Sequence, residues 1–153
     1  WLEVEYGVDI VKSRHTSGPI TGAALSSLHK FLLYGFITQD SHRVSEGLAL
    51  LADGISNCLF EETDPESDEV VLMKLLELSA LCLRCDVGTL LTNNGIWSIF
   101  ETNMTISSQE RDSGKFSLLG STADNTLAHI VLVVFSRAHD SVDRRGGSGT
   151  KDE

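Results

Sequence analysis

Apolar residues recur along this chain every three to four positions, in segments separated by glycine, proline and short polar residues. Such spacing is typical of helices that bury one face. Gly18 and Pro19 predict a first helix start, because proline is favoured at the first helical position, and Gly35 suits the helix end. The predicted apolar face between them consists of Ile20, Ala24, Leu25, Leu28, Phe31 and Leu32.

Two further helices are predicted in the middle of the chain. Asp40 or Ser41 is a candidate N-cap for the first of them, whose apolar positions are Val44, Leu48, Leu51, Ile55 and Leu59. Asp64 and Pro65 start the second, and the acids that follow suit the positive end of the helix dipole. Only a thin polar stripe interrupts its apolar residues, so we expect it to be buried on most sides and to end at Gly88.

The last third of the chain predicts two more helices with a polar loop between them. Thr92 or Asn93 can cap the first, whose apolar positions are Ile96, Trp97, Phe100 and Met104. Residues 107–115 are polar and predict a mobile loop. Ser121, with Asp124 three residues later, resembles a capping box for a last helix with the apolar positions Leu127, Ile130, Val131, Val134 and Ala138.

The end of the chain leaves one local alternative. Residues 130–135 taken alone also fit a buried strand, but the preceding cap and the continuation to Ala138 favour a helix. The glycine-rich segment after it is typical of a linker. We therefore predict one helical domain over residues 1–140 and a disordered linker or tail over residues 141–153.

The predicted helix starts fall near residues 19, 41, 65, 92 and 121, which is two starts per roughly 45–50 residues. Helical-hairpin repeats of the armadillo or HEAT kind have this pitch. We therefore predict an all-α fold, an armadillo/HEAT-like stack of helical hairpins of the right-handed α-solenoid type. The segments share no sequence motif, so a plain helical bundle is the alternative.

Charge and composition exclude several classes of function. The net charge of −10 and the scattered Lys and Arg residues argue against a nucleic-acid binder, which needs a basic stripe. The same charge argues against direct binding to anionic lipids. The chain contains no run of about 18–20 apolar residues, the length that a membrane span needs. We expect protein partners instead. The chain opens with Trp1, not Met, so we expect it to be a piece of a longer protein.

No reactive cluster is apparent in the sequence. Cys82 and Cys85 have the spacing of a metal half-site, but they lie in a leucine-rich segment without a second pair, and with Cys58 they suggest buried thiols in the cytosol. The histidines are scattered, and no nucleophile–base motif is present. We predict no catalytic residues, no metal and no cofactor. Four aromatic residues are either interface anchors or core: Tyr34, Phe36, Trp97 and Phe100.

Two long segments resemble a known family. Residues 64–76 read Asp-Pro-Glu-Ser-Asp-Glu-Val-Val-Leu-Met-Lys-Leu-Leu, and residues 16–32 form the second match. Shorter matches lie at 91–94 and 124–137. Together they resemble the N-terminal dimerisation and cyclophilin-binding domain of large Arf guanine nucleotide exchange factors, in the branch of the Golgi brefeldin-A-resistance factors, GNOM and the Gea proteins. Residues 106–123 depart from the family pattern.

The resemblance implies a non-catalytic, armadillo-like domain upstream of the homology region and the exchange domain. It implies homodimerisation, contacts with that homology region, possible binding of small GTPases or cyclophilin, and a cytoplasmic protein held indirectly at Golgi membranes. Lys30 and Glu69 match family residues associated with dimerisation, and Phe31, Tyr34, Val70 and Met73 would add apolar burial to that interface. The alternative is a monomeric armadillo-type adaptor that binds a small GTPase or a peptide.

Overall fold

A computed structural model describes residues 1–114 and 117–146, with side chains as far as residue 142. In this part of the chain all regular structure is helical, and the predicted all-α fold is confirmed. The helices are α1 (Leu2–Val11), α2 (Gly18–Leu33), α3 (Val44–Ser56), α4 (Pro65–Arg84), α5 (Asn93–Asp112) and α6 (Leu118–Gly146), with a short 3-10 helix, η1 (Asp86–Leu90), between α4 and α5.

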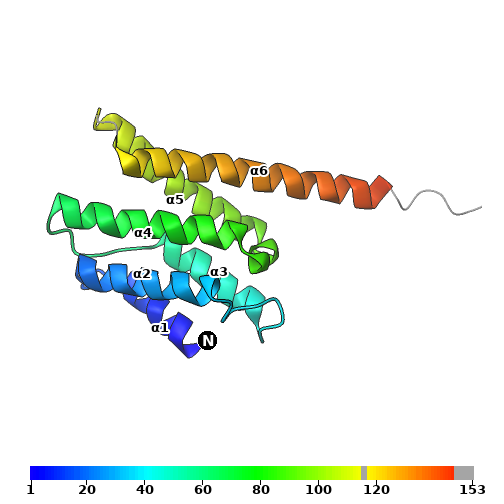
Figure 1. Ribbon diagram of the computed structural model, residues 1–153, viewed down its shortest axis with the longest axis horizontal. Helices are drawn as coiled ribbons and strands as arrows, with labels where there is room; N and C mark the ends of the chain where they lie inside the picture. Colours follow the sequence, from blue (N-terminus) through cyan, green and yellow to red (C-terminus); the bar gives the residue numbers. More distant parts are fainter. Residues whose placement is uncertain (115–116, 147–153) are drawn as a thin grey trace, which may run out of the picture.

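The helices alternate between two layers. The helices α2, α4 and α6 pack side by side in one layer, and α1, α3 and α5 pack side by side in the other (Figure 1). The pairs α1–α2 and α5–α6 are held together across the layers, and α4 contacts helices of both layers. This order agrees with stacked helical hairpins, whereas the assignment to a right-handed armadillo/HEAT-like solenoid stays a prediction.

Three helix ends follow local signals in the sequence. The Asp64 carboxylate accepts a hydrogen bond from the Ser67 backbone N–H at 3.2 Å, and the Thr92 hydroxyl accepts one from the Gly95 N–H at 3.0 Å. Gly35 ends α2 with φ +69°, in the left-handed region that favours glycine. The Phe36 N–H then donates to the Phe31 carbonyl at 3.0 Å, which closes a Schellman turn.

The start and end of α3 differ from the prediction. Arg43, with φ +57°, is its N-cap, and neither Asp40 nor Ser41 caps it. The Ser41 hydroxyl instead accepts a hydrogen bond from the Thr38 backbone N–H at 2.9 Å, so it closes the turn before the helix. Leu59 lies beyond the end of α3, where its N–H donates to the Val11 carbonyl at 2.8 Å.

Two other differences concern helices near the chain start and the middle. The helix α1 was not predicted, although it buries Val4, Val8 and Val11. The helix α4 is buried along one broad face from Val71 to Leu83, as expected, but it ends at Arg84 and not at Gly88. Gly88 lies within η1, which turns the chain toward α5.

The predicted loop at residues 107–115 is wrong as far as Asp112, because α5 continues to that residue. Ser107 is buried, and its hydroxyl donates to the Asp124 carboxylate of α6 at 2.5 Å. Arg111 donates to the same carboxylate at 2.9 Å, and these two hydrogen bonds hold the pKa of Asp124 below its ordinary value. Polar residues are helical here because a partner helix satisfies them.

The start and the end of α6 also differ from the prediction. The helix begins at Leu118, so Ser121, the predicted cap, lies inside it. Ser117 caps the helix instead, because its hydroxyl accepts a hydrogen bond from the Gly120 N–H at 2.9 Å. At the other end α6 continues to Gly146. The predicted boundary at residue 140 thus falls within a helix, and residues 147–153 of the predicted tail lie outside the described residues.

The three cysteines are free thiols among apolar neighbours. Burial raises the pKa of Cys58 to about 12 and raises the pKa of the fully buried Cys82 further. Such thiols are almost entirely protonated near neutral pH, and protonated thiols are poor nucleophiles and poor metal ligands. The burial of these side chains agrees with a role in packing.

The glycine in η1 generates a test of the fold. A Cβ atom at Gly88 would lie 2.2 Å from the Cys82 carbonyl oxygen, which is backbone and cannot rotate away. We expect Gly88→Ala to lower the free energy of unfolding by about 1–3 kcal/mol, as measured by urea denaturation.

Gly22→Ala is the matched control, because the nearest atom to its new Cβ is the flexible end of Lys74 at 3.4 Å. In a helix interior this change should be neutral or stabilising by about 0.5–1 kcal/mol. Equal effects of the two substitutions would contradict the close contact between η1 and α4.

Candidate interaction surfaces

The described residues offer surfaces for contact, not clustered reactive groups. Among them no group of three or more His, Cys, Asp and Glu side chains is placed to hold a metal ion. Large apolar side chains are nevertheless exposed on two separate faces of the helical stack. Because an exposed apolar patch usually marks a site of association, these two faces are the candidate functional sites.

The first face, the α2/α4 surface, lies where α2 and α4 run side by side in the same direction. Gly18 and Gly22 at the start of α2 lie against Val71 and Lys74 of α4. Farther along, a shallow hollow of about 170 Å³ opens between the helices. Its lining residues are Leu25, Ser26, His29, Lys30, Leu33, Tyr34, Lys74 and Glu77.

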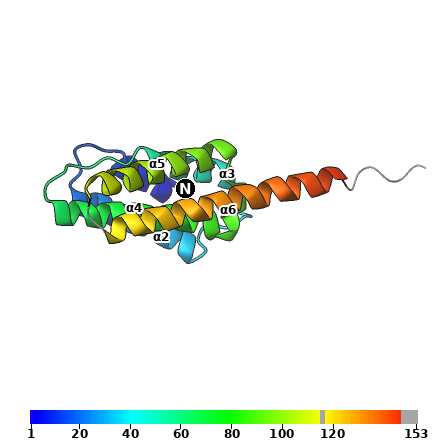
Figure 2. The same cartoon turned by 90° about the horizontal axis from the view of Figure 1, so that it is seen from above.

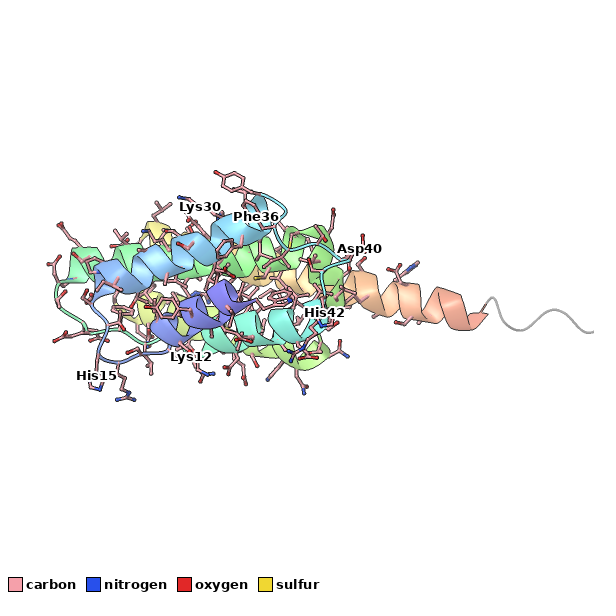
Figure 3. All side chains as sticks on the ribbon, turned by 90° about the horizontal axis from the view of Figure 1, so that it is seen from below. Lys12, His15, Lys30, Phe36, Asp40 and His42 are labelled. Atoms are coloured by element: carbon pink, nitrogen blue, oxygen red, sulfur yellow. The ribbon has the colours of Figure 1, made fainter. Side chains whose placement is uncertain are left out.

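All six residues of the predicted dimer interface lie in α2, in α4 or at Tyr34, the C-cap of α2. Four of them are exposed, namely Lys30, Tyr34, Glu69 and Val70. Phe31 and Met73 are half-buried and pack against the core. Phe31 also holds Phe36 edge-to-face, with 6.2 Å between the ring centroids. Figure 3 shows Lys30 and Phe36 at the outer edge of the molecule, along the second half of α2 and just after it.

Lys30 and Glu69 are not neighbours within one chain. Lys30 shares the α2/α4 hollow with Glu77, and Glu69 precedes Glu77 by eight residues in α4. At a rise of about 1.5 Å per residue, the two acidic positions lie about 12 Å apart along the helix axis. The two residues of the predicted charge pair therefore occupy different ends of the same surface.

The second face, the α5/α6 groove, is larger and more apolar. Its volume is about 520 Å³, and its lining residues are Asn93, Ile96, Trp97, Phe100, Ile130, Val131, Val134, Phe135, Arg137, Ala138 and Ser141. Trp97 is 59% exposed and Phe135 is 70% exposed, although both are large apolar side chains. The rings of Trp97 and Phe100 stack with centroids 5.4 Å apart.

The sequence pattern did not predict this groove. Met104, Val131 and Val134 were expected on the apolar faces of their helices, and Trp97 as either an interface anchor or core, yet each is at least 43% exposed. The helix α5 buries a neighbouring stripe instead, which contains Ile96, Ile99, Asn103 and Ile106. One signal was available, because the five apolar residues at 131–135 are too many for one buried face of a helix.

Arg137 anchors the far half of α6 to the body of the protein. Its guanidinium donates to the Leu91 carbonyl at 2.8 Å and to the Gly88 carbonyl at 2.6 Å. Both carbonyls lie at the end of η1, where the Gly88 carbonyl also accepts a hydrogen bond from the Leu91 N–H at 3.1 Å. Since Arg137 also lines the α5/α6 groove, it sets the position of one wall of that groove.

Over Leu118–Val142, α6 is long and apolar enough to cross a bilayer by length and composition, whereas we expected no such segment. The helix packs against α4 and α5, and 22% of the apolar window is buried within the protein. Length and composition alone are weak evidence for a span, and Arg137 with its two backbone partners lies within this stretch. Most of this apolar window is therefore exposed on the surface of α6.

Comparison with known proteins finds several ARF guanine-nucleotide exchange factors, although no family model matches the chain. The chain is 35% identical over 136 residues to ARF guanine-nucleotide exchange factor GNL1 of Arabidopsis thaliana, covering 89% of this chain and 9% of that protein. It is 33% identical over 133 residues to GNOM of the same organism, covering 87% and 9%. It is 31% identical over 131 residues to the Golgi-specific brefeldin A-resistance guanine nucleotide exchange factor 1 homolog of Caenorhabditis elegans, covering 85% and 6%. The chain thus spans less than a tenth of the length of each of these relatives.

The contact of Arg137 with η1 generates a prediction about local stability. Arg137→Met keeps an apolar stem but leaves two backbone carbonyls without their charged donor, so we expect a loss of about 1–3 kcal/mol. Amide hydrogen exchange should become faster in η1 and in α6 beyond Arg137. The matched control is Arg84→Met, because the Arg84 side chain donates only within its own helix, to the Ala80 carbonyl. Unchanged exchange in the Arg137 variant would show that it does not anchor α6.

Proposed function

The chain belongs to the family of large ARF guanine-nucleotide exchange factors, and we propose that it is a non-catalytic regulatory and dimerisation domain within such a protein. The observation that carries this proposal is the coverage of the relatives. Between 85% and 89% of the chain matches only 6–9% of proteins that are named as exchange factors. A segment of this size is one helical domain of a much longer chain, and nucleotide exchange would belong to another part of it.

The surfaces of the domain support a role in association. The described residues present two exposed apolar faces, while their acidic and sulfur-containing side chains form no candidate metal cluster. Through such faces the domain would contact a second copy, the downstream homology region, a small GTPase or a cyclophilin. One relative carries the word Golgi in its name, so we place the action of this chain in the cytoplasm, peripherally at Golgi membranes.

The α2/α4 surface is the one that we propose for dimerisation. Lys30 and Glu69 lie at different ends of this surface, so they are too far apart to pair within one chain. A two-fold axis between them would bring Lys30 of each copy to the partner's Glu69, because a symmetric interface makes every contact twice. Tyr34 and Val70, which are 66% and 54% exposed, would then be covered.

A second candidate function is a monomeric adaptor that binds a small GTPase or a peptide. The α5/α6 groove favours it, because a groove of about 520 Å³ between two helices can receive an amphipathic helix. In that case the chain stays monomeric, and the purified domain binds a membrane-associated GTPase in one nucleotide state more tightly than in the other.

A charge-reversal cycle tests the proposed dimer. Lys30→Glu and Glu69→Lys should each raise the dissociation constant of the dimer by about three- to thirtyfold, since each breaks two symmetric ion pairs. The double variant restores opposite charges and should recover most of the affinity. Sedimentation equilibrium of the 153-residue chain gives these constants.

Glu101→Lys serves as the control, because Glu101 is exposed on α5 and its reversal changes the net charge as Glu69→Lys does. The control should leave the dissociation constant unchanged within about twofold. A strict monomer at high micromolar concentration would refute dimerisation, and a cycle without coupling would remove Lys30 and Glu69 from the interface.

A further inference from the structure

One hydroxyl group of the chain differs in its surroundings from others that share its sequence pattern. Acid-directed protein kinases phosphorylate a serine or threonine that is followed, three residues later, by Asp or Glu, because their substrate groove is basic. Five positions of the chain have this pattern, namely Thr63, Ser98, Ser107, Ser121 and Thr150. Thr150 lies outside the described residues, so the structure decides among the other four.

Three of these four candidates are held inside helices. Ser98 and Ser107 lie in α5, Ser121 lies in α6, and none of the three is exposed. Ser107 is buried, and its hydroxyl donates to the Asp124 carboxylate. A kinase binds its substrate as an extended segment, because the acceptor hydroxyl has to reach the γ-phosphate of ATP in line. The three serines would have to leave their helices before they could react.

Thr63 lies instead in the connection between α3 and α4, at residues 57–64. Figure 1 and Figure 2 show this connection as a loop that runs outside the helices to the start of α4. Residues 61–67 are all exposed, and the backbone at Asp64 is extended, with φ −153° and ψ 127°. No hydrogen bond within the described part of the chain holds the Thr63 hydroxyl. A kinase can therefore reach this hydroxyl without unfolding a helix.

The residues on both sides of Thr63 match a basic substrate groove. Asp64 and Glu66 occupy the first and third positions after it, and Glu61 and Glu62 precede it. None of these four carboxylates forms an ion pair with any residue that the structure describes. They are therefore free to meet the Lys and Arg side chains of such a groove.

We propose that Thr63 is a phosphorylation site for an acid-directed serine/threonine kinase. The γ-phosphoryl group of ATP passes to Thr63 Oγ1: a bond between Oγ1 and phosphorus forms, the bond between phosphorus and the β–γ bridging oxygen breaks, and ADP leaves. The hydroxyl proton goes to the carboxylate base of the kinase. This modification goes beyond the proposed function and does not depend on whether the domain dimerises.

The added charge changes the junction between the starts of α2 and α4. The Thr63 backbone N–H donates to the Asp68 carboxylate at 3.4 Å, and Asp68 lies against Gly18 at the start of α2. A phosphate brings a charge of about −1.5 to −2, whereas the positive end of a helix supplies only about +0.5. Repulsion from Asp64 and Asp68 therefore outweighs attraction to the helix, and the phosphate loosens the connection from α4.

Incubation of the 153-residue chain with casein kinase 2 and MgATP tests the site. All samples carry Thr150→Ala, which removes the candidate outside the described residues, and circular dichroism checks the fold. We expect a single phosphate, located at Thr63 by peptide mass spectrometry, and Thr63→Ala should lower the initial rate at least about tenfold. A folded chain that takes up no phosphate, or takes it up at Ser98, Ser107 or Ser121, would overturn the proposal.

Two glutamates of α4 test the recognition of the site. Glu66→Gln removes the acid at the third position and leaves Thr63 intact, so kcat/KM of the kinase should fall at least about tenfold. Glu69→Gln is the matched control, because it removes the same charge from an exposed position of the same helix, six residues after Thr63. The control should change kcat/KM by less than about twofold. Equal effects would show that only the overall charge matters and would overturn the acid-directed site.

A peptide of residues 101–114 tests the selection by the fold. It contains Ser107 with Glu110 three residues later, but not the helices that bury Ser107 in the folded chain. We expect casein kinase 2 to phosphorylate Ser107 in the peptide and not in the folded chain. A peptide that takes up no phosphate would show that burial is not what excludes Ser107, and the structural selection of Thr63 would be overturned.

Amide hydrogen exchange of the phosphorylated and unphosphorylated chains tests the effect of the phosphate. The Thr63 amide and the first turn of α4 should exchange at least about threefold faster after phosphorylation, and high salt should reduce this difference because it screens exposed charges. Exchange in α5 should stay unchanged. Slower or unchanged exchange at the start of α4 would overturn the proposed loosening.

Discussion

The burial of α4 is the constraint on which the rest of this structure depends. Val71, Leu75, Leu76, Leu78 and Cys82 are at most 3% exposed, because helices of both layers pack on this one segment. A helix covered on so broad a face must lie between hairpins, since no single partner helix can cover it. The position of α4 therefore sets the arrangement of the other helices, and the outer faces lie at the two ends of the stack.

Polar contacts then decide where those outer faces lie. The Asp124 carboxylate joins Ser107 and Arg111 of α5 to α6, and Arg137 joins α6 to the end of η1. Both contacts hold helices that hydrophobic packing alone would leave free to slide or rotate, because hydrogen bonds are directional and apolar contacts are not. The α5/α6 groove is thus a defined surface, with walls fixed from both sides.

The two candidate faces differ in their physical character, which matters for a domain that would act through association. The α2/α4 surface carries charges of both signs, namely Lys30, Lys74 and Glu77, so contacts there depend on partner charge and on salt. The α5/α6 groove has no acidic lining residue, and contacts there depend mainly on apolar burial. In a chain of net charge −10, contacts at the two faces would therefore respond differently to salt.

The sequence by itself determined the features whose causes are local. Asp64, Thr92 and Gly35 set helix ends through contacts within four residues, and the apolar spacing established an all-α fold. Contacts between distant residues decided other features: Ser107 is helical because Asp124 accepts its hydrogen bond, and Arg137 joins α6 to η1. The start of α3 was missed although its cause is local, because Ser41 accepts a hydrogen bond from Thr38 and not from the helix. The family resemblance identified the candidate residues Lys30 and Glu69, whereas only the tertiary structure revealed the α5/α6 groove. Apolar spacing shows that a helix has an apolar face, but only the packing of its neighbours decides whether that face is covered.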